Sequence, residues 1–182
     1  VMSGYYNKPA ENEKAFTEDG YFRTGDAGRM EGNTLFFTER IKDLYKTSNG
    51  KYIAPQAIEM VMSGDQYIEQ IAVIGDQRKF VSALIVPAYS LLEKYAEEKG
   101  LAVGSREELV RNKEVLRLIE THIEENQKNL ASYEKIKRFT LLSEPFTMGS
   151  ELTDTLKLRR SVILKKYADS IEKMYEEASN PS

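Results

Sequence analysis

Residues 39–59 read ERIKDLYKTSNGKYIAPQAIE, and this stretch holds the most concentrated pattern in the 182-residue chain. It places Arg40 and three lysines between an apolar segment and a helix that opens at Pro55. Proline suits the first position of a helix because its missing amide proton would find no partner there. Asn49-Gly50 predicts a tight turn, so residues 43–54 should form a hairpin. A small domain does not need such charge density on so short a strand pair for its stability, and we therefore expect a functional surface here.

Beyond this hairpin, strand and helix patterns alternate. β-Branched apolar runs of strand length occupy residues 68–75 and 80–86, and a third strand is predicted at residues 135–142. These patterns predict an α+β fold, in which a small mixed sheet of about three strands, plus the two-stranded hairpin, packs with helices. Helix starts are predicted by the capping-box spacing of Ser90 with Glu93 and of Ser105 with Glu108. Further helices are expected at 55–63, at about 113–130 and at about 155–175.

The first 41 residues have a different character. Residues 1–26 are punctuated by turn signals, and residues 27–38 predict a hairpin that turns at Gly32-Asn33. A hairpin of this size is not stable by itself in water, and the remaining sequence offers no evident sheet to pair with it. We therefore expect residues 1–41 to be the β-rich tail of a large N-terminal domain, and residues 42–182 to form a separate C-terminal domain. On this interpretation the chain is a fragment of a longer protein.

Composition argues against several classes of function. The net charge of −3 argues against a nucleic-acid-binding protein, whose surface carries clustered positive charge. The absence of cysteine removes disulfides, thiolate nucleophiles and cysteine-ligated metals. The single histidine, His122, is expected to pack without chemistry, and Glu120, Glu124 and Glu125 to form a solvated helix face, so no metal site is predicted. No apolar run approaches the roughly 20 residues that span a bilayer.

Two further segments have side chains suited to sugar and phosphate chemistry. Residues 22–26 read FRTGD, and a carboxylate such as Asp26 offers two oxygens that match adjacent ribose hydroxyls. Residues 151–167 read ELTDTLKLRRSVILKKY and place Lys157 near the expected start of a basic helix. Cations there oppose the helix dipole, and such a local cost often marks a residue kept for a ligand. Without a ligand, these features would be an exposed carboxylate at a turn and a solvated helix end.

Together these segments resemble the adenylate-forming enzymes, the superfamily of acyl-CoA synthetases, luciferases and peptide-synthetase adenylation domains. The aromatic-Arg-Thr-Gly-Asp pattern that ends at Asp26 is similar to the family's ribose-binding motif, and the resemblance assigns Arg40 to the same ribose. Lys42 matches the hinge residue about which the family's C-terminal domain swings. Lys157 matches the catalytic lysine that reaches the acid substrate and the α-phosphate, and Arg160 follows it by three positions.

Residues 46–56, KTSNGKYIAPQ, look most like those of the long-chain fatty-acid–CoA ligases. The resemblance implies an acid–thiol ligase that uses ATP, Mg²⁺ and CoA, and that forms an acyl-adenylate before it forms acyl-CoA. A swing about Lys42 would withdraw Lys157 after the first step and bring the 43–54 hairpin to the active site. Five hairpin residues would then line the approach of CoA: Lys46, Ser48, Asn49, Gly50 and Lys51.

The sequence departs from the common pattern of this family beside the loop lysine. The preceding residue is usually glycine and is Leu156 here, and Asp154 or a neighbour replaces the usual proline. Long-chain ligases often carry this leucine or a methionine, so the departure indicates a subfamily.

The resemblance covers the C-terminal part of such an enzyme only, because the family's phosphate loop, adenine pocket and acyl tunnel are not in this sequence. We therefore expect the chain alone to make no acyl-CoA, and to act with the N-terminal adenylation domain of the same protein on a fatty acid, ATP and CoA. A cytoplasmic location is expected, with peripheral membrane contact left open. Two different functions stay open: a ligase for another acid, and a non-catalytic α+β interaction module in which Lys157 and Arg40 could become glutamine without loss of function.

Overall fold

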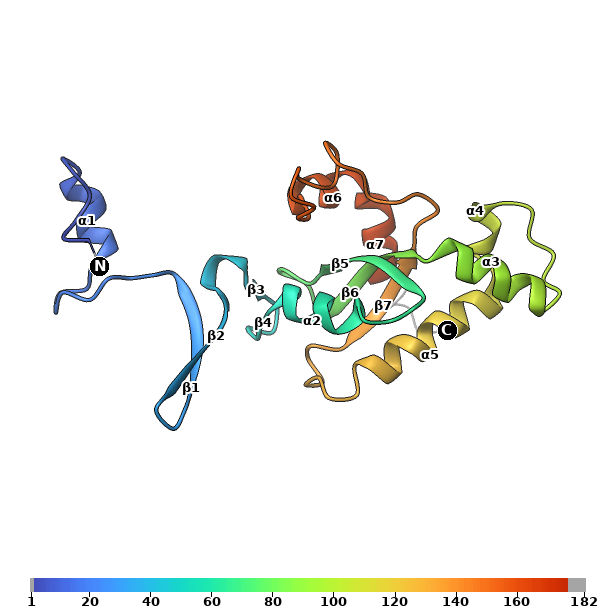
Figure 1. Ribbon diagram of the computed structural model, residues 1–182, viewed down its shortest axis with the longest axis horizontal. Coiled ribbons are helices and arrows are strands. Elements are labelled where there is room, and N and C mark those ends of the chain that lie inside the picture. Colours follow the sequence, from blue (N-terminus) through green and yellow to red (C-terminus); the bar gives the residue numbers. More distant parts are fainter. Residues whose placement is uncertain (1, 177–182) are drawn as a thin grey trace. The chain divides into compact units, whose positions relative to one another are not determined.

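The chain divides into two compact units, Val1–Leu44 and Tyr45–Ser182. The computed structural model in Figure 1 describes residues 2–176. Among these residues, every fully buried apolar side chain, from Ile53 to Met174, lies in the second unit. The second unit therefore has a hydrophobic core of its own, as a domain of this size requires.

The first unit is built on an antiparallel β-hairpin, in which β1 pairs with β2. Gly32 turns the hairpin with a φ of +59°, a conformation that glycine adopts without strain. These observations confirm the hairpin predicted for residues 27–38. The side chains of Leu35 and Phe37 are exposed, so the hairpin does not bury its apolar residues within this unit. The elements of the unit are α1 (Pro9–Ala15), β1 (Asp26–Glu31), β2 (Thr34–Arg40) and the 3-10 helix η1 (Ile41–Asp43).

The second unit contains a mixed three-stranded sheet in the order β5-β6-β7 and a separate two-stranded hairpin, β3-β4. β5 and β6 are antiparallel neighbours, whereas β6 and β7 are parallel. A parallel pair needs a long crossover connection, and the helical segment of residues 89–126 provides it. The predicted α+β fold, with three strands plus a hairpin, is confirmed. The strands are β3 (Tyr45–Lys46), β4 (Tyr52–Ile53), β5 (Ile68–Ile74), β6 (Val81–Pro87) and β7 (Ile136–Leu141).

Helices cover both faces of this sheet. Every residue of β6 is buried, and Figure 1 shows α5 on one side of the sheet and α6 and α7 on the other. α2 packs on β5 and on α5, and α7 packs on β7. The helices are α2 (Pro55–Met62), α3 (Tyr89–Glu98), α4 (Arg106–Leu109), α5 (Lys113–Asn126), α6 (Arg160–Lys166) and α7 (Ala168–Glu176).

The prediction of one helix at about 155–175 is wrong in two respects. The observed helix begins only at Arg160, because residues 153–157 form a tight turn, and the helical structure is interrupted at Tyr167. Adjacent residues of a continuous helix point about 100° apart, yet Lys166 and Tyr167 both reach the same carboxylate, that of Glu151. The interruption allows both contacts.

Two smaller expectations about helix ends are also wrong, and one is confirmed. α3 begins at Tyr89 without a side-chain cap, so Ser90 is not the cap, and α5 ends at Asn126 rather than near residue 130. The Ser105 hydroxyl accepts a hydrogen bond from the Glu108 amide, as the capping-box spacing predicted. Within residues 2–176, none of these helices is both long enough and apolar enough to cross a membrane.

Candidate functional site

The hairpin of the first unit brings Asp26 and Arg40 together. They occupy paired positions at the open end of β1 and β2, and Arg40 Nε lies 3.9 Å from Asp26 Oδ1. The Asp26 amide also donates to the Thr24 hydroxyl at 3.1 Å, which fixes the start of the strand. Both charged side chains remain substantially exposed. Their carboxylate and guanidinium therefore stay accessible to a ligand with adjacent hydroxyl groups.

Lys42 lies in η1, two residues before the boundary between the two units. Its side chain is exposed. The Ile41 amide donates to the Gly25 carbonyl at 2.8 Å, and the Leu44 amide donates to the Ile41 carbonyl at 3.3 Å. The segment around Lys42 is thus a single short turn, which is the kind of connection that absorbs domain rotations.

The hairpin from Tyr45 to Ile53 is closed by Thr47, which is buried. The Thr47 amide donates to the Lys51 carbonyl at 2.9 Å, and its hydroxyl accepts from the Lys51 amide at 3.1 Å. Gly50 completes the turn with a φ of +76°. Ser48, Asn49 and Gly50 are therefore held as an exposed tip with a fixed backbone.

The same hairpin is anchored to the turn between β5 and β6. The Lys46 carbonyl accepts from the Gln77 amide at 2.9 Å, and the Ser48 amide donates to the Arg78 carbonyl at 2.9 Å. The ammonium group of Lys46 lies 5.7 Å from the centre of the Tyr52 ring, and that of Lys51 lies 5.7 Å from the Tyr133 ring. Neither lysine forms an ion pair with a described acidic side chain. Their positive charge is therefore available to an anion.

Lys157 stands at the end of a second tight turn, residues 153–157. The Thr153 amide donates to the Lys157 carbonyl at 2.9 Å, and the Thr153 hydroxyl accepts from the Lys157 amide at 3.1 Å. The Lys157 side chain is exposed, and no described acidic group lies within ion-pair distance of it. The turn thus holds the backbone of Lys157 firmly and leaves its ammonium group free.

Leu156 adopts a left-handed backbone conformation within this turn, with a φ of +60°. Its amide donates to the Thr153 carbonyl at 2.9 Å. A residue other than glycine pays about 1–2 kcal/mol for this conformation, and the Leu156 side chain is 65% exposed. Glycine at this position would be unstrained.

Lys157 does not lie on a helix, and this corrects the dipole argument made from the sequence. The turn ends before α6, which begins at Arg160. The Arg160 guanidinium forms a two-pronged ion pair with Glu59, with both N–O distances 2.9 Å, and lies 5.4 Å from the centre of the Tyr45 ring. Arg160 is thus committed to the structure. Its contacts tie the start of α6 to both α2 and the β3-β4 hairpin.

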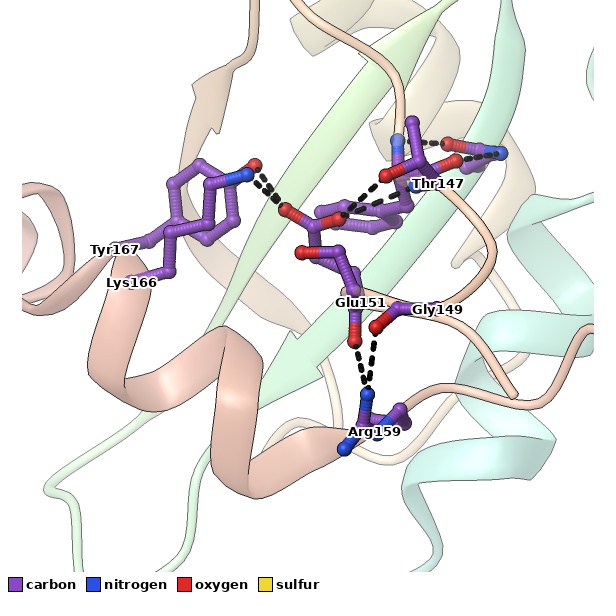
Figure 2. Close-up of polar contacts among 9 residues, drawn as sticks. Thr147, Gly149, Glu151, Arg159, Lys166 and Tyr167 are labelled. Carbon is purple, nitrogen blue, oxygen red and sulfur yellow. Dashed lines mark hydrogen bonds and ion pairs between the residues drawn. The ribbon is translucent and has the colours of Figure 1, made fainter.

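A fully buried carboxylate, that of Glu151, supports the segment before the Lys157 turn (Figure 2). Lys166 and the Tyr167 hydroxyl contact one of its oxygens, and the Thr147 amide and hydroxyl donate to the other at 3.2 and 3.3 Å. The Glu151 carbonyl accepts from the Arg159 amide at 2.7 Å. The Arg159 guanidinium in turn donates to the Gly149 and Ser150 carbonyls at 3.0 Å. This network holds both ends of the segment that carries Lys157.

The environment of Glu151 sets its ionisation. Burial by itself would raise the pKa of this carboxyl, but the hydrogen bonds from Lys166 and from the Thr147 amide outweigh it and lower the pKa to about 2. The charged form is therefore the one that the fold stabilises. A group of this kind contributes stability above its unfolded pKa, near 4.5, and loses it as the pH falls toward about 2.

Replacing Glu151 with glutamine is expected to remove this pH-dependent stability. The lowering of the Glu151 pKa corresponds to at most about 3 kcal/mol of stability. Water around the half-exposed Lys166 screens the interaction, so the expected loss in the free energy of unfolding is about 1–2 kcal/mol at pH 7. Denaturant unfolding of wild type and Glu151→Gln from pH 7 to pH 2 measures the gap in the free energy of unfolding. The gap should close in acid. A gap that stays constant over this range would contradict the role given to the carboxylate.

Sequence reasoning missed the supporting residues Glu151, Thr47 and Glu59. Glu59 Oε1 also accepts from the Val73 amide at 2.8 Å, so one carboxylate joins α2, β5 and α6. No feature of the sequence distinguishes Glu151, since Asp154 is a second acidic residue in the same segment.

The His122 side chain packs against Asp65 and Tyr67. Its Nδ1 lies 2.8 Å from Asp65 Oδ2, and its ring meets the Tyr67 ring edge-on. Burial would raise the pKa of Asp65, but hydrogen bonds from the Tyr67 amide, His122 and Asn126 lower it. Among the described residues, no three His, Asp or Glu side chains are grouped as metal ligands would be.

Sequence relatives cover nearly the whole chain. The chain is 34% identical over 181 residues to long-chain-fatty-acid–CoA ligase 5 of Mus musculus, a match that covers 97% of this chain and 26% of that protein. It is 32% identical over 178 residues to long-chain-fatty-acid–CoA ligase FadD15 of Mycobacterium tuberculosis, covering 96% and 30%. The chain thus spans 26–30% of the length of these curated relatives.

Solved structures share the fold. The adenylation domain of the carboxylate reductase from Mycobacterium chelonae matches with a TM-score of 0.72 and 29% identity, over 97% of this chain and 26% of that one. The A domain of carboxylic acid reductase from Segniliparus rugosus, in complex with AMP and a co-purified carboxylic acid, matches with a TM-score of 0.72 and 25% identity, over 98% and 27%. The profile of the AMP-binding enzyme C-terminal domain matches residues 42–179. Since this match spans most of the chain, the protein belongs to the family of AMP-binding enzyme C-terminal domains.

Proposed function

We propose that the chain acts as the C-terminal domain of a long-chain fatty-acid–CoA ligase, in which it serves two successive half-reactions. The observation that carries this proposal is the presence of two exposed cationic loops on one compact unit. One loop carries Lys157 and the other carries Lys46 and Lys51, and Arg160 links their bases through its contacts with Glu59 and Tyr45. A single rotation of the unit would therefore move both loops together. The ligase relatives at 32–34% identity support the class of reaction.

In the first half-reaction, a carboxylate oxygen of the fatty acid attacks the α-phosphorus of ATP and pyrophosphate leaves. The attack brings one anion to another, so positive charge near the phosphate lowers the barrier. Lys157 is suited to this role as the catalytic residue, because its ammonium is a compact charge on a flexible stem and is unpaired among the described side chains. Asp26 and Arg40 are suited to hold the ribose hydroxyls.

In the second half-reaction, the sulfur of CoA attacks the acyl carbon and AMP leaves. Rotation about the segment that contains Lys42 would withdraw Lys157 and present the β3-β4 hairpin. Lys46 and Lys51 would then meet the phosphates of CoA, and the exposed tip of Ser48, Asn49 and Gly50 would line its approach. The hydrogen bonds from this hairpin to the β5-β6 turn keep it rigid during such a movement.

ATP, Mg²⁺ and CoA enter this scheme as substrates. Mg²⁺ neutralises phosphate charge when it is bound to ATP. Because no described acidic cluster on this chain could hold the ion, we assign it to the phosphates and to the N-terminal adenylation domain, which is the proposed partner.

Acid-dependent exchange of pyrophosphate into ATP tests the proposed substrate class. In the complete enzyme that carries this chain, long-chain fatty acids are expected to support exchange at least about tenfold faster than aryl or short-chain acids at equal concentration, because the difference of several buried methylenes is worth more than about 1.4 kcal/mol. Exchange that is fastest with an aryl or short-chain acid would refute the fatty-acid assignment and leave the adenylating class intact.

A second candidate is adenylation of an acid for transfer to a carrier protein or for reduction. The structural likeness to carboxylate reductase adenylation domains, at 25–29% identity, is the observation that favours it. The two candidates differ in their thiol acceptor. Release of acyl-CoA from acyl-adenylate and free CoA is expected for the ligase, whereas a carrier-dependent enzyme would leave CoA unused.

A further inference from the structure

The turn before Lys157 contains a residue that the fold alone does not explain. Leu156 combines a strained, left-handed backbone with a side chain that is 65% exposed. Exposed leucines are common and need no explanation by themselves. A strained backbone usually persists where function requires it. The combination is informative because the unit gains neither relaxed geometry nor apolar burial from this side chain.

The surrounding turn does not need a leucine. The Leu156 amide donates to the Thr153 carbonyl, and the Thr153 amide donates to the Lys157 carbonyl. The Thr153 hydroxyl accepts from the Lys157 amide. All of these would form equally well with glycine at position 156, where a positive φ carries no strain. The turn therefore explains the backbone of residue 156 but not the leucine side chain.

We infer that Leu156 is a positioning residue, whose side chain packs on an apolar wall of the AMP-binding domain when the Lys157 turn is docked for adenylation. This inference rests on the proposed function. A wall of that chemistry fits because the site must accept a fatty acid, whose carboxylate lies at the reacting phosphorus and whose first methylenes lie beside it. Leu156 immediately precedes Lys157, so burial of the leucine favours the same docked state that brings the ammonium to the phosphate.

The inference predicts opposite effects on stability and on activity. Leu156→Gly removes backbone strain, so its thermal midpoint should be unchanged or raised by up to about 4 °C. Loss of the docked leucine should lower kcat/KM for acid-dependent pyrophosphate exchange by about tenfold, as expected for losing a partly buried side chain of this size. Thiolysis of supplied acyl-adenylate should stay within about twofold, because the turn is withdrawn in that step.

Three matched variants in the complete enzyme separate the causes. Leu156→Ala keeps the strain and loses the side chain, so it should lower adenylation as Leu156→Gly does without raising the midpoint. Leu156→Met replaces the side chain with another apolar one and should retain adenylation. Leu91→Ala removes an exposed leucine from α3 and should change neither half-reaction.

Adenylation within about twofold of wild type in both Leu156→Gly and Leu156→Ala would overturn the inference. An equal fall in adenylation and thiolysis would also overturn it, since that pattern indicates a general structural role. Lys157→Ala, assayed alongside, distinguishes these outcomes from failure of the proposed function. If Lys157→Ala adenylates normally, the function assigned to the turn is wrong. If only the Leu156 variants adenylate normally, the proposed function is retained and the positioning role of Leu156 is wrong.

Discussion

Lys157→Ala is expected to lower the rate of acyl-adenylate formation in the complete enzyme by about 10²–10³-fold, the usual effect of removing one group that stabilises transition-state charge. Lys157 has no ion-pair partner among the described side chains, so its removal leaves no buried charge unpaired. The hydrogen bonds that shape the turn come from backbone groups and from Thr153, and they survive the change. Stability should therefore be unaffected. Acid-dependent pyrophosphate exchange measures the loss.

The same variant should process supplied acyl-adenylate with CoA at a rate within about twofold of wild type, because the ammonium is withdrawn during thiolysis. Lys165→Ala is a matched control, since it removes an exposed lysine from the nearby helix α6 and should leave both half-reactions unchanged. A Lys157→Ala enzyme that loses both half-reactions to the same extent would contradict the assignment of this lysine to adenylation alone.

Lys42→Pro is expected to have the opposite effect. Proline fixes φ near −65°, which suits the 3-10 conformation that Lys42 adopts here. The hydrogen bonds described for this segment are donated by Ile41 and Leu44, so the substitution removes neither of them. A rotation that needs a different φ at this position would become unfavourable. We expect the fixed conformation to be the adenylating one, so thiolysis should fall by about a hundredfold, as for a state made about 2.7 kcal/mol less accessible, while adenylation persists.

The control for this change is Lys42→Ala, which removes the charge and keeps backbone freedom. It should support both half-reactions. Thermal unfolding should give Lys42→Pro a midpoint similar to that of wild type. Equal loss of thiolysis in Lys42→Ala and Lys42→Pro would show that the side chain, and not rotation of the backbone, matters at this position.

Local signals in the sequence predicted those parts of the fold that are set locally. Gly32 and Gly50 mark turns that require a positive φ, and Pro55 marks the first residue of α2. The β-branched runs predicted β5 and β6, because β-branched side chains pack well on the buried surface of a sheet. The α+β arrangement followed from the order of these elements.

The parts that were not predicted depend on contacts between residues far apart in the sequence. α6 begins at Arg160 because the Thr153–Lys157 turn and the Glu59 ion pair, 101 residues away along the chain, hold that start. The interruption at Tyr167 follows from two contacts with Glu151. A local sequence pattern does not indicate such distant partners. The basic, helix-favouring segment therefore predicted one continuous helix.

The residues of the candidate site also divide into those that the sequence could predict and those that it could not. Motif residues such as Asp26, Arg40 and Lys157 could be named from the sequence, because their chemistry and spacing are distinctive, and their roles remain predictions. The residues that hold them in place could not be named. Thr47 and Glu151 are ordinary residues whose importance comes from burial and hydrogen bonding, which only the folded structure reveals.

The ratio of adenylation rate to thiolysis rate tests most directly whether one rigid unit serves both steps with different loops. Measured in the complete enzyme with one long-chain fatty acid, this ratio should fall at least about a hundredfold in Lys157→Ala and rise about a hundredfold in Lys42→Pro. A ratio that stays within about threefold of wild type in both variants would contradict the account, because the two loops would then not act in separate half-reactions.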